Sequence, residues 1–487
     1  MALSPGVRPA AAAGLVLAVL VATACTAAEP RTGPLPSPSP STSQSAPTPR
    51  PTETQPEPTG SASEPAAPRR TEPLALAVHP RRPPLDLGRR LARSLVRGEI
   101  RDWASLGATP APLEVRRGAG AVAATQRDPD VVAAVRASRV GPTMQVLRVD
   151  GVDPLRSPRA YPLRVRTSQP PPQVTTITVT GDIMLGRRVG DLAAAAGDVS
   201  APLRPLQDRL ARADLTVGNL ESTLSRAGAP RQGDDSFAAP PTVLDGLDDA
   251  GFDLLSLANN HTGDFGPSAL RRTLRRIDAS DIERVGAGRD GTAAWRPAVL
   301  EHGGIRFGFV AFNAIGETPR ATRRTPGAAE IRMPPRTGPL DQRDLASFTG
   351  GIERLDRHVD VVIAMPHWGE QYTNQPVPAQ RRVGRALLDA GADIVVGGHP
   401  HWVQGVQVHR DRLIVHSLGN FVFDMDFMRE TMEGALLELV FWDDTLRGAR
   451  FVPYAMDSTF TPRLVSGDHA EQILDLIWAA SDPPFRS

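Results

Sequence analysis

The sequence predicts an α/β domain whose functional side chains lie at the carboxyl ends of buried strands. Five short apolar segments have the composition and length of such strands, and a polar side chain able to bind a metal follows each one closely. Helical patterns precede several of them, as in 242–251 and 379–390. In α/β sheets, ligands bind at this end of the strands. The predicted strands are 174–180, 213–217, 252–258, 359–364 and 392–396.

The last of these strands leads into Gly397-Gly-His-Pro-His401. His399 and His401 are two residues apart, so on an extended segment both imidazoles point the same way. The two glycines before them allow a sharp turn and the close approach of a ligand. Imidazole is the commonest metal-binding side chain. The alternative is a pair of histidines that are hydrogen-bonded within a loop, and this segment alone does not decide between the two.

The other strand ends also carry candidate ligands, and each has an ordinary structural explanation. Asp182 could cap a helix, Asn219 or Glu221 could be turn residues, and His261 could be a hydrogen-bonded surface histidine. Five coincident strand ends favour one shared site over five separate explanations.

The first 25 residues predict an export signal. Arg8 supplies a weak positive start, and the apolar run 10–22 is short for a membrane span. Cys25, the only cysteine, follows small residues where a signal peptidase would cut. The segment resembles a bacterial lipobox, with Ala22 where leucine is usual. We therefore expect a signal peptide at 1–24 and a lipid anchor at Cys25, on the extracytoplasmic face of the cell membrane; plain secretion is the alternative.

Two further segments precede the main domain. Residues 25–72 are rich in Pro, Ser, Thr and Ala, which predicts a disordered tether. Residues 73–168 form a separate piece, with a predicted strand at 74–78 and a predicted helix at 85–97. Within it, 91–107 resembles a helix and Gly-x-Ile-x-x-Trp turn of periplasmic phosphate-binding proteins. This resemblance implies a small, truncated α/β binding-protein-like module.

Composition excludes several kinds of chemistry. A formal net charge of +1 gives no overall field, so we expect no nucleic-acid partner. All 55 basic residues are arginine, which excludes lysine chemistry such as Schiff-base formation. A single cysteine leaves no internal disulfide.

Six motifs in order resemble the capsule-synthesis protein CapA family, which includes proteins of poly-γ-glutamate synthesis and is related to calcineurin-like metallophosphoesterases. The resemblance covers 174–456 and implies a four-layer sandwich of two β-sheets flanked by helices, with a metal site at the strand ends. Residues 457–487 then form a C-terminal helical extension. The motifs are Gly-Asp-Ile-Met-Leu-Gly, Asn-Leu-Glu, Leu-Ala-Asn-Asn-His, His-Trp-Gly, Gly-Gly-His-Pro-His and Ser-Leu-Gly-Asn-Phe.

The resemblance also implies roles for single residues. His261 lies near the substrate, where it would act as general acid. Met184 stands where the phosphoesterases have a histidine, and a thioether is a poor ligand for hard or borderline divalent ions, so one metal position is weakened. One or two ions of manganese, iron or zinc suit the mixed nitrogen and oxygen donors. The implied ligands are Asp182, Glu221 (less favoured, Asn219), Asn260, His367, His399 and His401.

Two functions remain open at this stage. The first is a metal-dependent hydrolase that acts outside the cytoplasm on a cell-envelope or capsule polymer of the poly-γ-glutamate type, or on a phosphoester. The second is a non-catalytic factor for assembly or export of a capsule polymer, which keeps the metallophosphatase fold for binding. A well-ordered site for two ions would favour the hydrolase.

Overall fold

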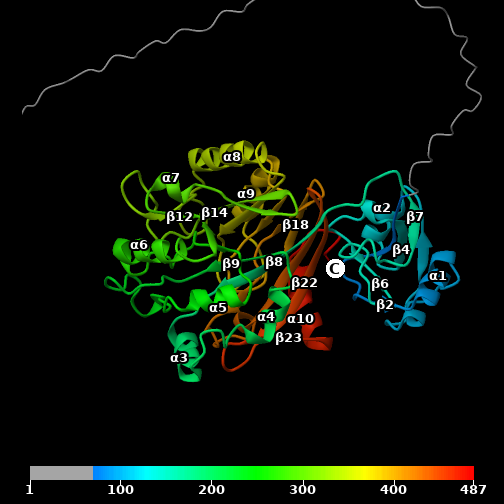
Figure 1. The fold of residues 1–487 in the computed structure, drawn as a ribbon, viewed down its shortest axis with the longest axis horizontal. Helices are drawn as coiled ribbons and strands as arrows, with labels where there is room; N and C mark the ends of the chain where they lie inside the picture. The colour runs from blue at the N-terminus through cyan, green and yellow to red at the C-terminus, as the bar shows by residue number, and fades with distance from the viewer. Residues whose placement is uncertain (1–69, 487) are drawn as a thin grey trace, which may run out of the picture. The chain divides into compact units, whose positions relative to one another are not determined.

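The computed structural model describes residues 70–486 (Figure 1). The predicted signal peptide, Cys25 and nearly all of the predicted tether lie outside the described residues. The first strand, β1, spans Thr71–Val78, so it includes the last two residues assigned to the tether. In the part of the chain that the structure describes, no helix has the length and apolar character needed to cross a membrane.

Residues 70–168 build a small sheet of their own around β1, in the strand order β3-β4-β1-β5 with β7 also paired to β1. The predicted helix at 85–97 begins only at Arg89, because Asp86–Leu87 pairs with Arg148–Val149 as a short parallel ladder. Trp103 is fully buried and opens a 3-10 turn. The elements are β2 (Asp86–Leu87), α1 (Arg89–Arg97), β3 (Glu114–Arg116), α2 (Ala121–Arg127), β4 (Val131–Arg136), β5 (Gln145–Val146), β6 (Arg148–Val149) and β7 (Arg164–Arg166).

The main domain contains two large sheets. The first has the order β11-β10-β9-β8-β21-β22-β23, with β20 also paired to β8, and its strands β8 to β11 are parallel. This sheet, called sheet I below, consists of β8 (Val174–Ile183), β9 (Leu215–Leu220), β10 (Leu254–Ser256), β11 (Glu283–Val285), β20 (Asn420–Val422), β21 (Glu433–Trp442), β22 (Thr445–Met456) and β23 (Pro462–Leu464).

The second sheet, called sheet II below, has the order β13-β14-β16-β17-β19-β18, and its central strands β14, β16, β17 and β19 are parallel. It consists of β13 (Ala298–His302), β14 (Ile305–Asn313), β16 (Val361–His367), β17 (Ile394–Val396), β18 (Val406–His409) and β19 (Arg412–Val415). A separate two-stranded ladder joins β12 (Ala287–Gly288) to β15 (Gly327–Ala328).

Adjacent residues of one strand enter different cores, which gives the domain its layers. In β16, Ile363 packs between the two sheets, whereas Val362 packs against α8 and α9. In β10, Leu254 packs between the sheets, whereas Leu255 packs against α5 and α6. Strands buried on both faces explain why these segments are continuously apolar. The helices are α3 (Arg187–Ala196), α4 (Arg204–Leu210), α5 (Val243–Asp249), α6 (Gly266–Ile277), α7 (Gly291–Ala294), α8 (Gln342–Asp356), α9 (Pro378–Asp389) and α10 (Gly467–Ala479).

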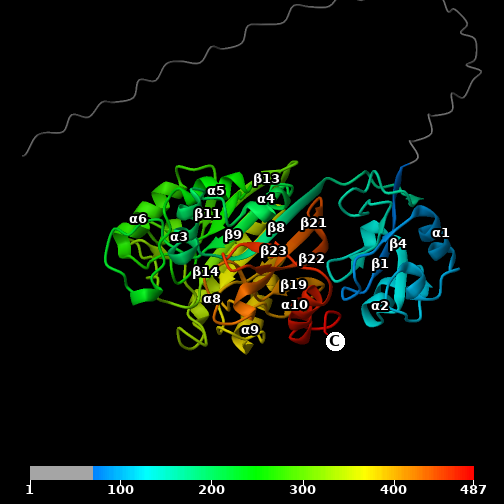
Figure 2. The same ribbon diagram turned by 90° about the horizontal axis from the view of Figure 1, so that it is seen from below.

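Figure 2 shows the resulting four layers, with α5 and α6 on one side of the strands and α8 and α9 on the other. The predicted fold class, two sheets flanked by helices, is confirmed. The predicted strands correspond to β8, β9, β10, β16 and β17. The C-terminal extension contains α10 as expected, but it also supplies β23, which pairs with β22.

Candidate metal centre

The carboxyl ends of five parallel strands, three from sheet I and two from sheet II, meet at one place. Each of the seven predicted residues there is at most 5% exposed. Sheet I places its residues on β8, directly after β9 and after β10, and sheet II places its residues at the end of β16 and after β17. These residues are Asp182, Glu221, Asn260 and His261 from sheet I, and His367, His399 and His401 from sheet II.

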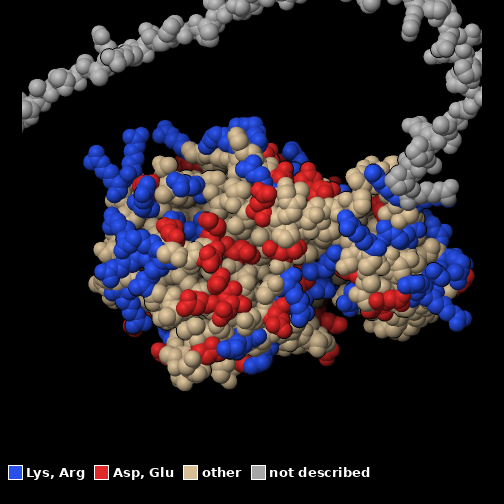
Figure 3. Space-filling model, in the orientation of Figure 1, with Lys and Arg blue, Asp and Glu red and all other residues tan. Residues whose placement is uncertain are grey.

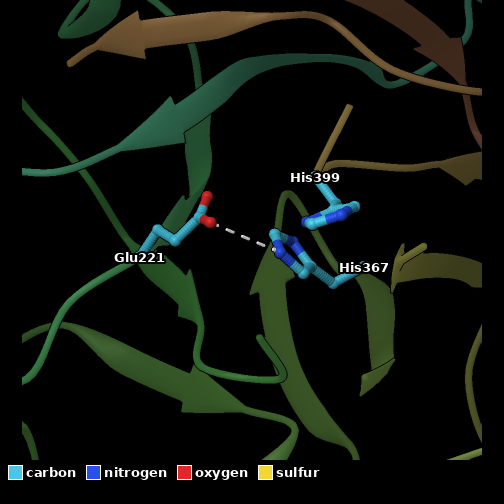
Figure 4. A group of neighbouring side chains, drawn as sticks. All are labelled: Glu221, His367 and His399. Atoms are coloured by element: carbon cyan, nitrogen blue, oxygen red, sulfur yellow. Dashed lines mark ion pairs between the residues drawn. The ribbon is translucent and has the colours of Figure 1, made fainter. Parts of the chain in front are cut away.

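Six of these residues could bind metal through their side chains, and five of them form two overlapping groups. One group is Glu221, His367 and His399, and the other is Asp182, Glu221 and His401; within each group, the ligand atoms lie within 4.8 Å of one another. Figure 4 draws the first group, in which His367 Nε2 lies 3.5 Å from Glu221 Oε1. Glu221 is the one residue that belongs to both groups.

Several of these ligand atoms have no hydrogen-bond partner among the described residues. They are both carboxylate oxygens of Glu221, both ring nitrogens of His399, and Nε2 of His401, and all are buried. An unpaired buried polar atom costs about 1–3 kcal/mol, so a cluster of them indicates a missing ligand. A divalent cation accepts lone pairs from carboxylate and imidazole together, so the donor set fits the metal that the family resemblance implies.

Burial also sets the charge of the group. It raises the pKa of Asp182 to about 7, with help from the nearby carboxyl of Glu221, and raises the pKa of Glu221 to about 8. Burial lowers the pKa of His367 to about 4 and of His401 to about 3, and lowers the pKa of His399 well below its usual range. Neutral imidazole is the form that binds a metal, so the histidines need no deprotonation at neutral pH.

Asn420 fixes the tautomer of His401. The Asn420 side-chain amide donates to Thr431 O at 2.9 Å, so its Oδ1 faces the ring and accepts from His401 Nδ1 at 2.8 Å. With the proton on Nδ1, the lone pair of His401 is on the unpartnered Nε2, which points to the carboxylates. Orientation of a ligating imidazole through its other nitrogen is the usual arrangement at metal sites.

A second chain of contacts orients Asn260. Its amide nitrogen donates to Glu317 Oε2 at 2.9 Å, which leaves Oδ1 facing His367 Nε2 at 2.8 Å. Glu317 has a φ of +61° and also pairs with Arg336 at 3.1 Å. Asn260 Oδ1 and His367 Nε2 are thus hydrogen-bonded to each other, so Glu317 orients the Asn260 amide and Asn260 in turn holds the His367 ring.

His261 is held differently from the three other imidazoles. Its Nδ1 lies 2.8 Å from Asp264 Oδ2, and its Nε2 lies 3.9 Å from Glu221 Oε1. Asp264 also accepts from the Phe237 backbone N–H and from Gln232, each at 2.6 Å, so it acts as an acceptor towards the ring as well. The Phe237 ring stacks on His261 at 3.8 Å. These contacts leave Nε2 as the ring nitrogen that faces Glu221.

The backbone of the His399 and His401 segment differs from the expectation. The residues are not on an extended strand: their φ angles are +96° and +57°, so the two rings converge through a strained turn after β17. Such conformations cost about 1–3 kcal/mol each and persist where surrounding contacts impose them. The His399 N–H donates to Asp182 Oδ2 at 2.9 Å, and a Cβ on Gly398 would lie 2.5 Å from Asp182 Oδ1.

Asn219 and Met184 have structural roles. Asn219 donates to Asp182 Oδ1 at 2.8 Å and accepts from Asn259 at 3.0 Å, so both ends of its amide are in use, and Glu221 is the residue found in both ligand groups. Met184 is fully buried in the core beside sheet I, and its Sδ accepts from the Gly186 N–H at 3.1 Å. The roles assigned to the seven residues stay predictions.

Sequence reasoning did not assign roles to Asp264, Glu317 or Asn420. Asp264 follows the Leu-Ala-Asn-Asn-His motif by three residues, and Asn420 lies within Ser-Leu-Gly-Asn-Phe, so their positions next to or inside motifs could have suggested them. Glu317 lies in the loop after β14, which carries no motif, and only the fold brings it to Asn260.

Two sheets flanked by helices, with metal-competent side chains at their shared rim, define the metallophosphoesterase-like class of fold. Residues 176–425, about half of the chain, match the family model described as bacterial capsule synthesis protein PGA_cap. The chain belongs to this family.

Individual relatives agree with this assignment. The chain is 32% identical over 268 residues to the capsule biosynthesis protein CapA of Bacillus anthracis, covering 54% of this chain and 63% of that protein, just under two thirds of its length. It is 30% identical over 269 residues to the PGA biosynthesis protein CapA of Bacillus subtilis (strain 168), covering 54% and 67%. A crystal structure of a hypothetical protein from Thermus thermophilus aligns with 17% identity and a TM-score of 0.37, over 58% of this chain and 99% of that one.

Proposed function

We propose that this chain is a metal-dependent hydrolase that cleaves a cell-envelope or capsule polymer of the poly-γ-glutamate type, or a phosphoester. One observation carries the proposal: His261, held by Asp264, presents Nε2 at 3.9 Å to the carboxylate that both ligand groups share. A factor that only binds a polymer has no need for a proton-carrying group directed at a metal centre.

The residues present account for three tasks. Asp182, Glu221, Asn260, His367, His399 and His401 would hold one or two ions of manganese, iron or zinc. A divalent cation held there would lower the pKa of a water molecule and polarise the bond to be cleaved. His261, when protonated on both ring nitrogens, would donate a proton to the leaving group through Nε2, and Asp264, which accepts from Nδ1–H, would stabilise that charged ring and fix its orientation.

We also propose that the mature protein is anchored by a lipid on Cys25, on the extracytoplasmic face of the membrane. The support is the sequence 1–25, with its short apolar run and its single cysteine after small residues. Labelling cells with a clickable fatty acid should mark the wild type and leave Cys25→Ser unmarked. Equal release of both proteins to the medium would contradict the anchor and favour secretion.

The test of the hydrolase is a reconstitution. The full chain is stripped with chelator, reloaded separately with Mn²⁺, Fe²⁺ and Zn²⁺, and assayed on bis(p-nitrophenyl) phosphate, a γ-glutamyl anilide and poly-γ-glutamate. We expect turnover of at least one substrate class with at least one ion, and none in the stripped protein. If the chain binds metal in a fixed stoichiometric ratio but cleaves none of the three substrates, the proposal fails. A non-catalytic factor for capsule assembly or export then takes its place.

A further inference from the structure

A dense group of arginines lies on one face of α6, away from the metal ligands. Arg271, Arg272, Arg275 and Arg276 are all exposed, whereas the opposite side of the helix is buried in the core beside sheet I. The helical repeat places the four side chains within roughly 140° of arc. Figure 3 shows basic side chains gathered at the side of the domain where Figure 1 labels α6.

These arginines do not serve the fold through ion pairs. Among the described residues, none of the four forms one, whereas Arg284, just beyond the helix, pairs with Asp278 at 2.6 Å. Like charges four residues apart destabilise a helix. The arrangement is therefore unfavourable for the isolated protein and becomes favourable when an anion lies against it.

The same face forms one wall of a groove. Arg272, Arg275 and Arg276 line it together with Pro241, Leu244 and a single carboxylate, Asp245. The lining carries a net positive charge, and the half-buried Pro241 adds a small apolar surface beside the guanidinium groups. Such a groove suits a flexible chain that has both methylene groups and acid groups.

The arginine surface continues towards the metal centre. The Arg231 backbone N–H donates to Asp264 O at 2.9 Å, and Asp264 orients His261. Gly266, the first residue of α6, has a φ of +79°, and a Cβ there would lie 3.0 Å from Arg231 Nε. The missing side chain leaves room for the Arg231 guanidinium at the start of the helix, so arginines extend from the His261 loop along α6.

We propose that this surface, Arg231 with the four arginines of α6, binds a polycarboxylate chain and leads it to the metal centre. Arginines four apart are spaced about 6 Å along a helix and can each take a carboxylate through two parallel hydrogen bonds. Pro241 offers an apolar contact for the methylene groups of such a chain, which a polyphosphate lacks. The delivery of the polymer to the metal centre rests on the proposed function, whereas its binding to the arginine surface does not.

Binding is measured on the detergent-solubilised full chain by the fluorescence anisotropy of labelled poly-γ-glutamate at increasing NaCl, with polyphosphate and neutral dextran of similar length as parallel probes. The test variant is Arg272→Gln/Arg275→Gln/Arg276→Gln, since glutamine keeps the helix and removes charge. The matched control is Arg90→Gln/Arg93→Gln/Arg101→Gln, three exposed arginines of the 70–168 module that give the same change in net charge.

We expect the test variant to bind poly-γ-glutamate about tenfold more weakly than wild type and with a shallower salt dependence, while the control variant binds as wild type. Hydrolysis of the small nitrophenyl ester should be unchanged in both variants. The His399→Ala/His401→Ala variant should still bind the polymer, so failure of the hydrolase leaves this result standing. Equal weakening in both arginine variants, no binding by wild type, or tighter binding of polyphosphate than of polyglutamate would each overturn the proposal.

Discussion

The two sheets contribute different chemistry to the candidate metal centre. Sheet I supplies the oxygen donors, Asp182, Glu221 and Asn260, and sheet II supplies only imidazoles. Burial raises the pKa of the carboxyl groups and lowers that of the imidazoles. Without a cation, burial therefore favours the uncharged forms of both the carboxyl groups and the imidazoles. A cation between them changes this balance, because it favours ionised carboxylates and neutral imidazoles at once.

The same contrast appears in how two imidazoles are held. On the sheet I side, the His261 ring is bonded to a carboxylate, Asp264, whereas the ring of His401 from sheet II is bonded to an amide, Asn420. A carboxylate shares the positive charge of a ring protonated on both nitrogens, and an amide fixes the tautomer without adding charge. The partners therefore support the different roles proposed for the two rings, proton donation by His261 and metal binding by His401, although both are buried histidines.

The largest effect is expected from removing two of the three imidazoles that sheet II contributes to the centre. His399→Ala combined with His401→Ala takes one imidazole from each ligand group, so the purified protein should lose its metal to background in elemental analysis. His409→Ala serves as the control, since His409 pairs with Asp389 at 2.8 Å far from the ligand groups and should leave metal content unchanged. Full metal content in the double variant would show that His399 and His401 are not needed to hold the ion and that His367 and the sheet I donors suffice.

Loss of His261 should separate catalysis from metal binding. His261→Ala should keep its metal and lose about 10²–10⁴-fold in kcat, the usual contribution of general acid catalysis. The loss should shrink with nitrophenolate as leaving group, because that group departs without a proton. If metal content falls as far as in the double histidine variant, His261 is a ligand and the distinction drawn from Asp264 fails.

Asp264→Asn tests the same distinction without removing the ring. The Phe237 N–H and His261 Nδ1 both contact Oδ2, so the asparagine oxygen can keep these two contacts, but the residue loses the negative charge that stabilises a ring protonated on both nitrogens. We expect kcat to fall by about 10²-fold, no further than in His261→Ala, at unchanged metal content. Circular dichroism and metal analysis check that the fold and the centre survive; an unaltered kcat would contradict a positioning role for Asp264.

The sequence predicted which strand-end residues lie together better than it predicted the backbone turn and the hydrogen-bond partners that position them. Short apolar strands followed by polar residues predicted that Asp182, Glu221, His367 and the other strand ends lie together, because parallel strands end at one rim. The turn at His399 and His401 was predicted with the wrong geometry, since positive φ at a histidine is imposed by Asp182 and not by local preference. Partners such as Glu317, distant in sequence and without a motif, become visible only once the chain is folded.

A smaller effect is expected at Asn420, the amide that orients the sheet II ligand His401. Asn420→Ala removes the acceptor of His401 Nδ1, so the ring can rotate or change tautomer. Loss of such a contact typically weakens metal binding by about 10–100-fold. Competition with a fluorescent chelator measures this directly, and kcat at saturating metal should change little. A fall in kcat with metal affinity intact would place His401 in proton transfer and reverse the roles of the two rings.

The smallest effect is expected at Glu317, which orients the one amide ligand of sheet I. Glu317→Gln retains an oxygen that accepts from Asn260 and loses only the charge that pairs with the partly exposed Arg336, an interaction worth about 0.2–1 kcal/mol. Metal affinity should therefore fall by no more than about fivefold. Glu317→Ala removes the acceptor as well and should weaken binding further, because Asn260 is then free to turn its oxygen away from His367. Titration of both variants with the same ion separates orientation from charge. If glutamine weakens binding as much as alanine does, the negative charge of Glu317 acts on the cation directly, and the loop after β14 of sheet II contributes a carboxylate to the centre.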